Sequence, residues 1–195
     1  MRTPKGYTTI EQIEDYLLIM IDPAFGAQVS DWIAKIEEYI ERFTSRIFIV
    51  PGSDSSNLYD GDNTDTLLID DAMSITSVEI GSDDDGWTDV TDDCYFYPAN
   101  KTPKTRIVYD GKFTRGNQNI KVTGKFAYST AVPGDLEFAI TVIVAGMINK
   151  SQDKTGVVQS MTIGRYSVSY DNTKGWDDFK QAQETLSSYR KIKII

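Results

Sequence analysis

The hydrophobic pattern of this chain changes twice, and the changes separate helical regions from a strand region. Residues 27–45 repeat apolar side chains every three or four positions, which predicts an amphipathic helix. Residues 47–129 lose that period and instead show short alternating runs between turn residues, which predicts strands. Residues 136–148 are apolar almost all the way round, which is typical of a helix enclosed by other elements.

Two helices are predicted before residue 46. Thr8 is expected to cap the first, with Glu11 bonding back to the cap, and this helix runs to about Met20, where Asp22-Pro23 ends it. The second helix, at residues 27–45, carries an apolar stripe for which packing against the other helices is a simpler explanation than a ligand groove. The stripe consists of Trp32, Ile33, Ile36, Tyr39, Ile40 and Phe43.

Short strands separated by turn residues are predicted across the middle of the chain. The candidates are Arg46–Val50, Leu58–Tyr59, Thr66–Ile69, Ser74–Ile80, Trp87–Val90, Cys94–Tyr97, Thr105–Tyr109 and Ile120–Tyr128. Strands at such short spacing favour a small antiparallel β module, a barrel or a sandwich. It lies between the helix pair and the apolar helix, as an insertion.

The C-terminal third adds a hairpin and a last helix. The apolar helix covers Leu136–Ile148, Val157–Ile163 and Tyr166–Tyr170 form the predicted hairpin, and about Gly175–Arg190 forms the last helix. The expected fold class is therefore α+β: a small helical core of about four helices, with an inserted antiparallel β module and a C-terminal hairpin plus helix.

Two parts are expected, and they differ in charge. Residues 1–46 and 129–195 form the helical core, and residues 47–128 form the acidic β module. The net charge is -9, yet residues 47–100 hold thirteen Asp and Glu and no Lys or Arg, while residues 101–195 carry 15 basic and 8 acidic residues. This asymmetry predicts faces with different neighbours, and an ordinary solvated surface is the alternative.

The absence of histidine and the single cysteine, Cys94, narrow the chemistry of the chain. They exclude an intrachain disulfide, Ser-His-Asp and Cys-His catalysis, and zinc sites that use histidine. Cys94 follows Asp93, whose carboxylate disfavours a thiolate, so a packed strand residue is expected rather than a nucleophile. A carboxylate-dependent hydrolase stays open as an alternative, although the spacing nominates no pair of acids.

The loop Asp60–Asp65 is a weak candidate for a calcium site. Counted from Asp60, oxygen ligands are offered by Asp62, Thr64 and Asp71 at EF-hand-like offsets. However, Asp65 stands where the sharp turn of that motif needs glycine, and strands flank the loop. A solvated hairpin turn is the preferred interpretation, with no metal and no cofactor expected. A calcium- or carbohydrate-binding β module remains an alternative function.

The tail of the sequence alternates like a strand with nothing after it to pair with. It consists of Lys191, Ile192, Lys193, Ile194 and Ile195. We expect it to dock on a sheet edge or groove of another subunit, and a disordered terminus is the alternative. No signal peptide is visible, and the longest apolar run falls short of the roughly 20 residues of a membrane span, so a soluble protein without a membrane partner is expected.

Several motifs, taken in chain order, carry a family resemblance. They are the two opening helices, Leu58-Tyr59-Asp60-Gly61, Thr64–Ile69, Ser74–Val78, Asn119–Gly124 followed by Val132-Pro133 and the apolar helix, and Gly156…Ile163-Gly164 with Tyr166–Ser169. Together they resemble the head–tail connector family (adaptor or head-completion proteins) of tailed double-stranded DNA bacteriophages. The likeness spans most of the chain.

The resemblance implies a structural virion protein without enzymatic activity, assembled in the host cytoplasm and located in the neck. Family members form a ring, twelvefold by expectation, below the portal protein, and they contact the next connector (stopper) or a tail protein. DNA passes through the channel without sequence-specific binding. Because an acidic lining repels the DNA backbone, part of residues 47–100 is expected to line the channel or to face the neighbouring ring.

Overall fold

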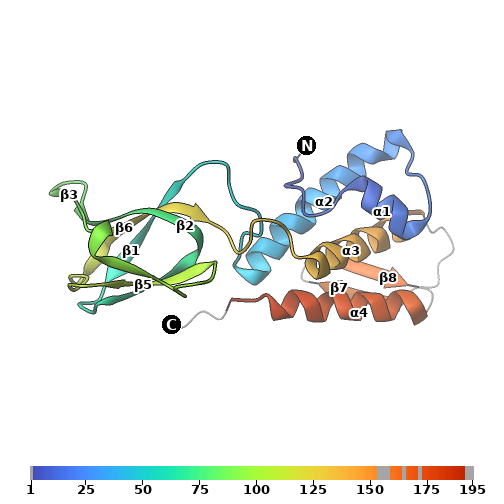
Figure 1. The fold of residues 1–195 in the computed structure, drawn as a ribbon. Coiled ribbons are helices and arrows are strands. Elements are labelled where there is room, and N and C mark those ends of the chain that lie inside the picture. Colours follow the sequence, from blue (N-terminus) through green and yellow to red (C-terminus); the bar gives the residue numbers. More distant parts are fainter. Residues whose placement is uncertain (1, 153–158, 164–165, 171–172, 192–195) are drawn as a thin grey trace. The chain divides into compact units, whose positions relative to one another are not determined.

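The structure, a computed structural model, contains in its described residues four α-helices with a two-stranded antiparallel hairpin, and a separate six-stranded antiparallel sheet (Figure 1). It describes residues 2–152, 159–163, 166–170 and 173–191. The chain divides into two compact units: residues 1–46 with 132–195, here called the helical unit, and residues 47–131, here called the β unit. The predicted α+β fold class is confirmed.

The helical unit is built around α3. Its elements are α1 (Ile10–Leu17), α2 (Pro23–Thr44), α3 (Gly134–Gln152), the paired strands β7 (Gln159–Ile163) and β8 (Tyr166–Tyr170), and α4 (Thr173–Ser188). The helix α3 contacts α1, α2, α4 and β8. No helix among the described residues has the length and apolar character needed to cross a membrane.

The apolar helix predicted from the sequence is α3, and most of its residues between Leu136 and Ile148 are buried. Its buried residues are Leu136, Ala139, Ile140, Thr141, Val142, Ile143, Val144, Ala145 and Ile148. The polar member, Thr141, has its hydroxyl 2.7 Å from the hydroxyl of Thr8 and donates to the carbonyl oxygen of Glu137. A buried hydroxyl is tolerated here because it is hydrogen-bonded.

The predicted helix boundaries need correction at α1 and α2. The cap of α1 is Thr9 rather than Thr8, and Gln12 rather than Glu11 bonds back to it, at 2.8 Å. Asp22-Pro23 begins α2 rather than ending α1: the Asp22 carboxylate accepts the Ala24 N–H at 2.8 Å, with proline in the first helical turn. Thr8 is buried, so its hydroxyl serves packing instead of capping.

The β unit is one six-stranded antiparallel sheet. Its strands are β1 (Ser55–Gly61), β2 (Thr66–Ser82), β3 (Gly86–Asp89), β4 (Cys94–Tyr97), β5 (Lys104–Tyr109) and β6 (Gly116–Phe126). The order is β1-β6-β2-β5-β4, with β3 paired to β2.

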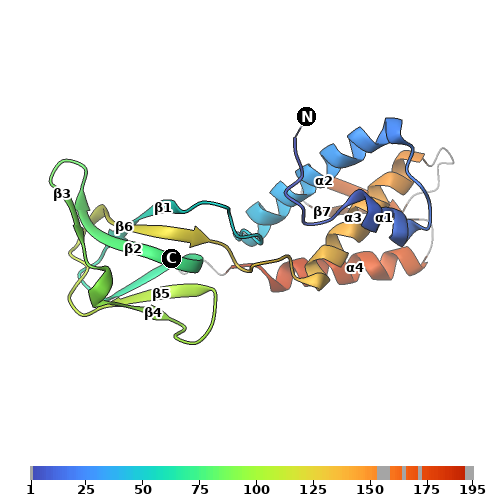
Figure 2. The ribbon, with the colours of Figure 1, turned by 45° about the horizontal axis from the view of Figure 1, so that its top comes forward.

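The long strand β2 joins two strands that the sequence pattern predicts as separate, Thr66–Ile69 and Ser74–Ile80. Its first half pairs with β5 and its second half with β6 and β3 (Figure 2). The register with β6 shifts between Ala72 and Ser74, and such an irregularity bends a strand, which lets one strand serve both halves of the sheet. The strand predicted at Arg46–Val50 is absent from the structure, which has irregular backbone there.

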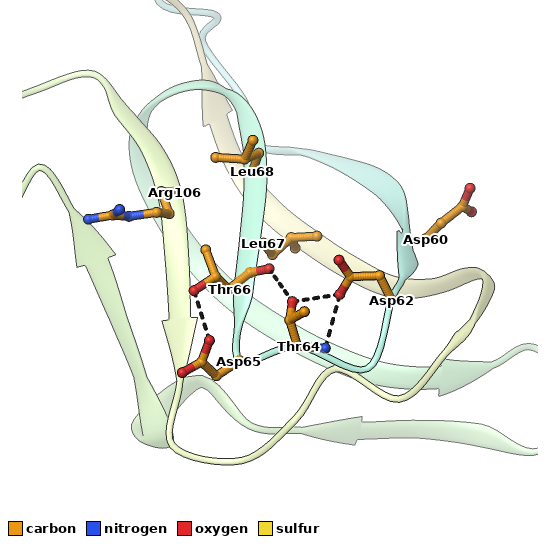
Figure 3. Close-up of a pocket in the computed structure, with 8 residues that line it drawn as sticks. All are labelled: Asp60, Asp62, Thr64, Asp65, Thr66, Leu67, Leu68 and Arg106. Carbon is orange, nitrogen blue, oxygen red and sulfur yellow. Dashed lines mark hydrogen bonds between the residues drawn. The ribbon is translucent and has the colours of Figure 1, made fainter. Parts of the chain in front are cut away.

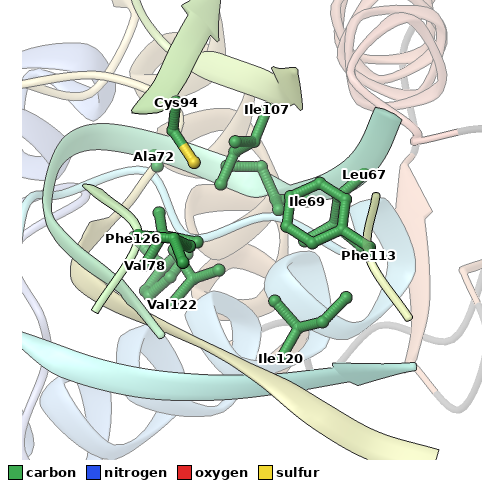
Figure 4. Close-up of a cluster of buried hydrophobic side chains, with 11 residues drawn as sticks. Leu67, Ile69, Ala72, Val78, Cys94, Ile107, Phe113, Ile120, Val122 and Phe126 are labelled. Carbon is green, nitrogen blue, oxygen red and sulfur yellow. The ribbon is translucent and has the colours of Figure 1, made fainter. Parts of the chain in front are cut away.

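Buried side chains fill the β unit with its own core (Figure 4). They are Leu67, Ile69, Ala72, Val78, Val90, Cys94, Ile107, Phe113, Ile120, Val122 and Phe126. They alternate with partly exposed residues along β6, which explains why the period-2 pattern of that strand is visible in the sequence.

Candidate interaction surfaces

Asp60 at the end of β1, and Asp62 and Asp65 in the turn that leads to β2, line an open pocket of about 600 Å³ (Figure 3). The residues that line it are Asp60, Asp62, Thr64, Asp65, Thr66, Leu67, Leu68 and Arg106. Figure 3 shows the side chains of Asp60, Asp62 and Asp65 pointing in different directions and Arg106 extending away from all three.

Each of these carboxylates accepts hydrogen bonds from its own surroundings. Asp60 accepts the Gln118 N–H at 2.6 Å, and Asp65 accepts the Thr66 hydroxyl at 2.9 Å. Asp62 accepts the Thr64 hydroxyl at 2.5 Å and the Thr64 N–H at 3.0 Å, and these bonds lower the pKa of the Asp62 carboxyl. Within the described part of the chain, no three His, Cys, Asp or Glu side chains are grouped to hold a metal ion. The geometry is that of a hydrogen-bonded turn.

The outer face of β2, β5 and β4 carries aromatic and apolar side chains. The strand registers align Thr66, Val108 and Tyr95 in one row, and Leu68, Arg106 and Tyr97 in the next. Leu68 and Tyr95 are each 59% exposed, and the Arg106 guanidinium lies 4.9 Å from the centre of the Tyr97 ring. Tyrosine and arginine on an apolar surface are typical of protein interfaces.

Cys94 is a packed residue of β4, as its sequence context predicts. Its side chain is buried in the core of the β unit. Burial raises the pKa of the thiol to about 11, and the charges of Asp93 and Asp89 act in the same direction. The thiol therefore stays protonated at neutral pH, which argues against a nucleophilic role.

A buried carboxylate in the helical unit was missed by the sequence prediction. Glu37 of α2 is completely buried and accepts the backbone N–H groups of Lys5 at 2.5 Å, Gly6 at 3.1 Å and Tyr7 at 2.8 Å. Gly6 has φ +90°, a conformation that favours glycine and that helps to aim successive N–H groups at one anion. This arrangement fixes the N-terminal segment on α2.

The net effect of this environment is to raise the pKa of Glu37, because desolvation outweighs the three N–H donors. Neighbouring bonds extend the attachment: Lys5 Nζ lies 2.5 Å from the Glu41 carboxylate, and the Tyr7 hydroxyl also bonds to Glu41. The sequence does contain a signal for this site, since Glu37 lies within the apolar stripe, four residues after Ile33 and three before Ile40.

The start of the predicted docking tail is anchored to the end of α2. The Lys191 N–H donates to the Thr44 carbonyl oxygen at 2.8 Å, and Arg46 Nε donates to the Tyr189 carbonyl oxygen at 2.8 Å. Thr44 ends α2, where carbonyl groups lack partners inside the helix. The remaining tail residues, 192–195, lie outside the described residues.

Comparison with known proteins identifies solved structures with the same fold. A chain in the neck of an empty gene transfer agent (GTA) particle, solved with C6 symmetry, has a TM-score of 0.62 and 12% identity, covering 100% of this chain and 95% of that chain. A chain in the virion of the native GTA particle has a TM-score of 0.59 and 13% identity, with coverage of 100% and 95%.

A third chain, in the neck of the native GTA particle with C12 symmetry, has a TM-score of 0.53 and 14% identity, covering 100% of this chain and 94% of that chain. No protein-family model matches the sequence, and the search of curated proteins found no match. The likeness therefore lies in three dimensions: this chain shares, over its whole length, the fold of chains found in the GTA neck and virion structures.

Proposed function

We propose that this chain is a structural neck protein of a tailed-phage-like particle. In this role it is a head–tail connector whose copies form a ring below the portal, extend the DNA channel and join the capsid vertex to the tail. The observation that carries the proposal is the fold, which both units together share with a chain of a GTA neck over 100% of this chain's length. The resemblance of the sequence motifs to the connector family supports it independently.

The described side chains support a role in which no bond is made or broken. The Cys94 thiol is buried with a raised pKa, and the aspartates of the pocket are held in turn hydrogen bonds. In contrast, aromatic, apolar and arginine side chains are available for contacts on the outer face of β2, β5 and β4. These are properties of an assembly component.

The charge of the β unit supports a place beside DNA or facing another ring. Residues 47–131 contain fourteen acidic and seven basic residues. A surface of this sign repels phosphates, so DNA passes without binding. Part of residues 47–100 then lines the channel or faces the neighbouring ring. A cryo-EM map that places this segment on the outer rim, without a partner, would contradict this point.

The symmetry of the assemblies that contain the structurally similar chains supports a ring. They come from neck structures with C6 and C12 symmetry, and a closed ring requires head-to-tail contacts between different surfaces of identical subunits. We propose twelve copies, bound to the portal protein on one side and to the next connector (stopper) or a tail protein on the other.

The proposal is tested by mixing the purified chain with the portal of the same particle. Cryo-EM should show a ring of this protein on the portal, with portal alone and chain alone as controls. Failure of the chain to associate with the portal, together with a substrate turned over by the purified chain, would replace the structural role with an enzymatic one.

The docking tail is tested separately by removing residues 192–195 and keeping Lys191, because its N–H bonds to Thr44. If the tail docks on a sheet edge or groove of the portal or of a neighbouring copy, the shortened chain keeps its thermal midpoint and loses portal binding. A large fall in the midpoint of the monomer would instead identify these residues as part of its own core.

A further inference from the structure

The loop between α1 and α2 exposes three consecutive apolar side chains. Leu18, Ile19 and Met20, here called the Leu18–Met20 loop, are 89%, 40% and 93% exposed. Two residues before the loop, Tyr16 of α1 meets the ring of Phe138 of α3 edge-on at 5.8 Å, and Phe138 is 43% exposed. Leu18 and Met20 thus contribute almost nothing to the core of their own unit.

Hydrogen bonds hold this loop in one conformation. The Glu14 carbonyl oxygen accepts the N–H of Leu18 and, at 3.2 Å, that of Ile19, while the Glu14 carboxylate accepts the Ile21 N–H at 2.7 Å. Ile21 is buried and anchors the end of the loop, and Asp22 then caps α2. A loop that is already ordered loses little entropy when it binds, which favours a role as a preformed contact.

The backbone conformation of Leu18 indicates that its exposed side chain has a role outside its own unit. Leu18 has φ 56°, in the left-handed region that favours glycine. The helix α2 ends in the same conformation at Ser45, with φ 55°, where a small polar residue stands. Glycine would end α1 at less cost, so leucine at this position keeps a strained backbone for a side chain that its own unit does not bury.

The surroundings of the loop are acidic, and the far end of the helical unit is basic. Residues 8–34 contain five acidic residues and no basic ones. Residues 42–46 and 186–191 contain four basic residues and no acidic ones: Arg42, Arg46, Arg190 and Lys191. Hydrogen bonds between Arg46 and Tyr189, and between Lys191 and Thr44, bring these two segments together. We call this second region the basic end of α2.

The basic end of α2 also carries an aromatic surface. Tyr39 and Phe43 are partly exposed and stack with ring centres 5.9 Å apart, and the Arg190 guanidinium lies 5.6 Å from the centre of the Phe43 ring. The aromatic pair with neighbouring arginines matches the apolar loop with neighbouring carboxylates: both surfaces are apolar, and their charges are opposite.

We propose that the Leu18–Met20 loop of one copy docks on the basic end of α2 of a second copy. The loop precedes the first turn of α2, and the docking surface begins at Tyr39, in the second half of the helix (Figure 1). At 1.5 Å per residue, about 24 Å of helix or more separates the two surfaces within one chain. Only another copy brings them together. The contact is heterologous and repeats from copy to copy, as a ring requires. This inference rests on the proposed ring and names the surfaces that close it.

A double substitution, Leu18→Gly with Met20→Ser, tests the proposal. The monomer should keep its thermal midpoint or gain slightly, because both side chains are exposed and glycine suits the backbone of residue 18. Assembly should weaken by roughly 100-fold or more, since burying each apolar side chain contributes about one to two factors of ten. Sedimentation velocity and negative-stain images, with and without the portal, measure both states.

The matched control is Leu58→Ser, which removes a 47% exposed leucine from β1, outside the outer face of β2, β5 and β4, and should leave ring assembly unchanged. Equal loss with the control, or normal rings from the double variant while the wild type also forms rings, overturns this inference and leaves the proposed function standing. A wild-type chain that forms no ring with or without the portal overturns the proposed function, and this inference with it.

The identity of the partner is tested by a photo-crosslinking amino acid in place of Met20 in the assembled ring. Mass spectrometry should find the crosslink on Tyr39, Phe43 or Arg190 of a second copy. A crosslink to the portal protein or to another surface of this chain overturns the proposal.

Discussion

In the helical unit one helix contributes the largest share of the buried core residues, whereas in the β unit several strands and loops contribute them. Nearly every residue of α3 between Leu136 and Ile148 is buried, and the other helices supply one face each. The core of the β unit takes residues from β2, β4, β5 and β6 and from two loops. A helical core therefore depends on side-chain volume along one helix, while the β core depends on strand register as well.

The two units also differ in how charge is distributed over them. Residues 47–131 hold fourteen acidic and seven basic residues, whereas residues 1–46 with 132–195 hold fifteen acidic and thirteen basic ones. In the helical unit residues 8–34 carry only acidic charges and residues 42–46 with 186–191 only basic ones, while Glu37, Glu38 and Glu41 of α2 lie between these segments. Separated signs suit contacts between copies, and a single dominant sign suits repulsion of DNA.

The largest expected effects come from truncating the two cores. Ile140 of α3 and Ile107 of β5 are both fully buried, so Ile140→Ala and Ile107→Ala should each lower the free energy of unfolding by about 2–5 kcal/mol. Hydrogen exchange should then show lost protection in the helices for the first variant and in the strands for the second. Loss of protection throughout the chain in both variants would show that the units unfold as one.

A second pair of variants replaces one glycine of each unit by alanine and compares the change in stability. A Cβ on Gly124 of β6 would lie 2.2 Å from the Ser74 carbonyl oxygen of β2, so Gly124→Ala must displace a strand and should cost about 3 kcal/mol. A Cβ on Gly134, the first residue of α3, meets nothing within 4 Å, and Gly134→Ala should be neutral or stabilising by up to about 1 kcal/mol. Chemical denaturation measures both, and similar costs at the two sites would contradict the packing described here.

The sequence was sufficient for α3 because its pattern is local. Thirteen consecutive residues without a polar face specify a buried helix regardless of what surrounds it, and the structure places α3 there. The four residues of β4, Cys94–Tyr97, were also predicted correctly, since turn residues border them closely.

Features that depend on distant partners were not predictable in the same way. The continuity of β2 through residues 70–73 is set by its pairing with β5 and β6, and no short-range pattern encodes that pairing. Thr9, rather than the predicted Thr8, caps α1, because the Thr8 hydroxyl bonds to that of Thr141, 133 residues away. Exposure of the Leu18–Met20 loop also required the structure, since the pattern extended the first helix to about Met20.

A smaller effect is expected from Glu37, in the pH dependence of stability. Its pKa is raised above the ordinary value of 4.5, so the folded state retains a proton that the unfolded state has already lost. The contribution of Glu37 to stability is therefore complete below about pH 4.5 and declines as the pH rises through the folded pKa. Relative to Glu37→Gln, which does not titrate, the wild type should lose free energy of unfolding as the pH rises above about 4.5.

Urea denaturation across that pH range measures the difference, with Glu38→Gln as the matched control. Glu38 is the next residue on α2 and is exposed, with its carboxylate bonded to Arg2. Its substitution removes the same charge from an exposed position of the same helix, so the difference between the two variants isolates the buried site of Glu37. Identical profiles for the two variants would show that the three backbone donors offset the cost of burying the charge.

The smallest expected effects on stability come from removing one surface lysine from each unit. Lys121 of β6 lies 3.0 Å from the Glu79 carboxylate and 4.3 Å from the centre of the Trp87 ring, and its side chain is only 23% exposed. Lys35 of α2 makes a single pair with Asp31, one helical turn away, and is 39% exposed. Lys121→Ala should therefore cost about 1 kcal/mol, and Lys35→Ala about 0.3–0.5 kcal/mol.

Salt distinguishes the two lysines further. Added sodium chloride screens an exposed pair more than a half-buried one, so the cost of Lys35→Ala should vanish near 1 M salt while most of the cost of Lys121→Ala remains. Thermal denaturation of both variants at low and high salt measures this. If the destabilisation by Lys121→Ala also vanishes at high salt, the contact of Lys121 with Trp87 adds no stability beyond the ion pair. The surface of the β unit is then no better packed at this site than that of the helical unit at Lys35.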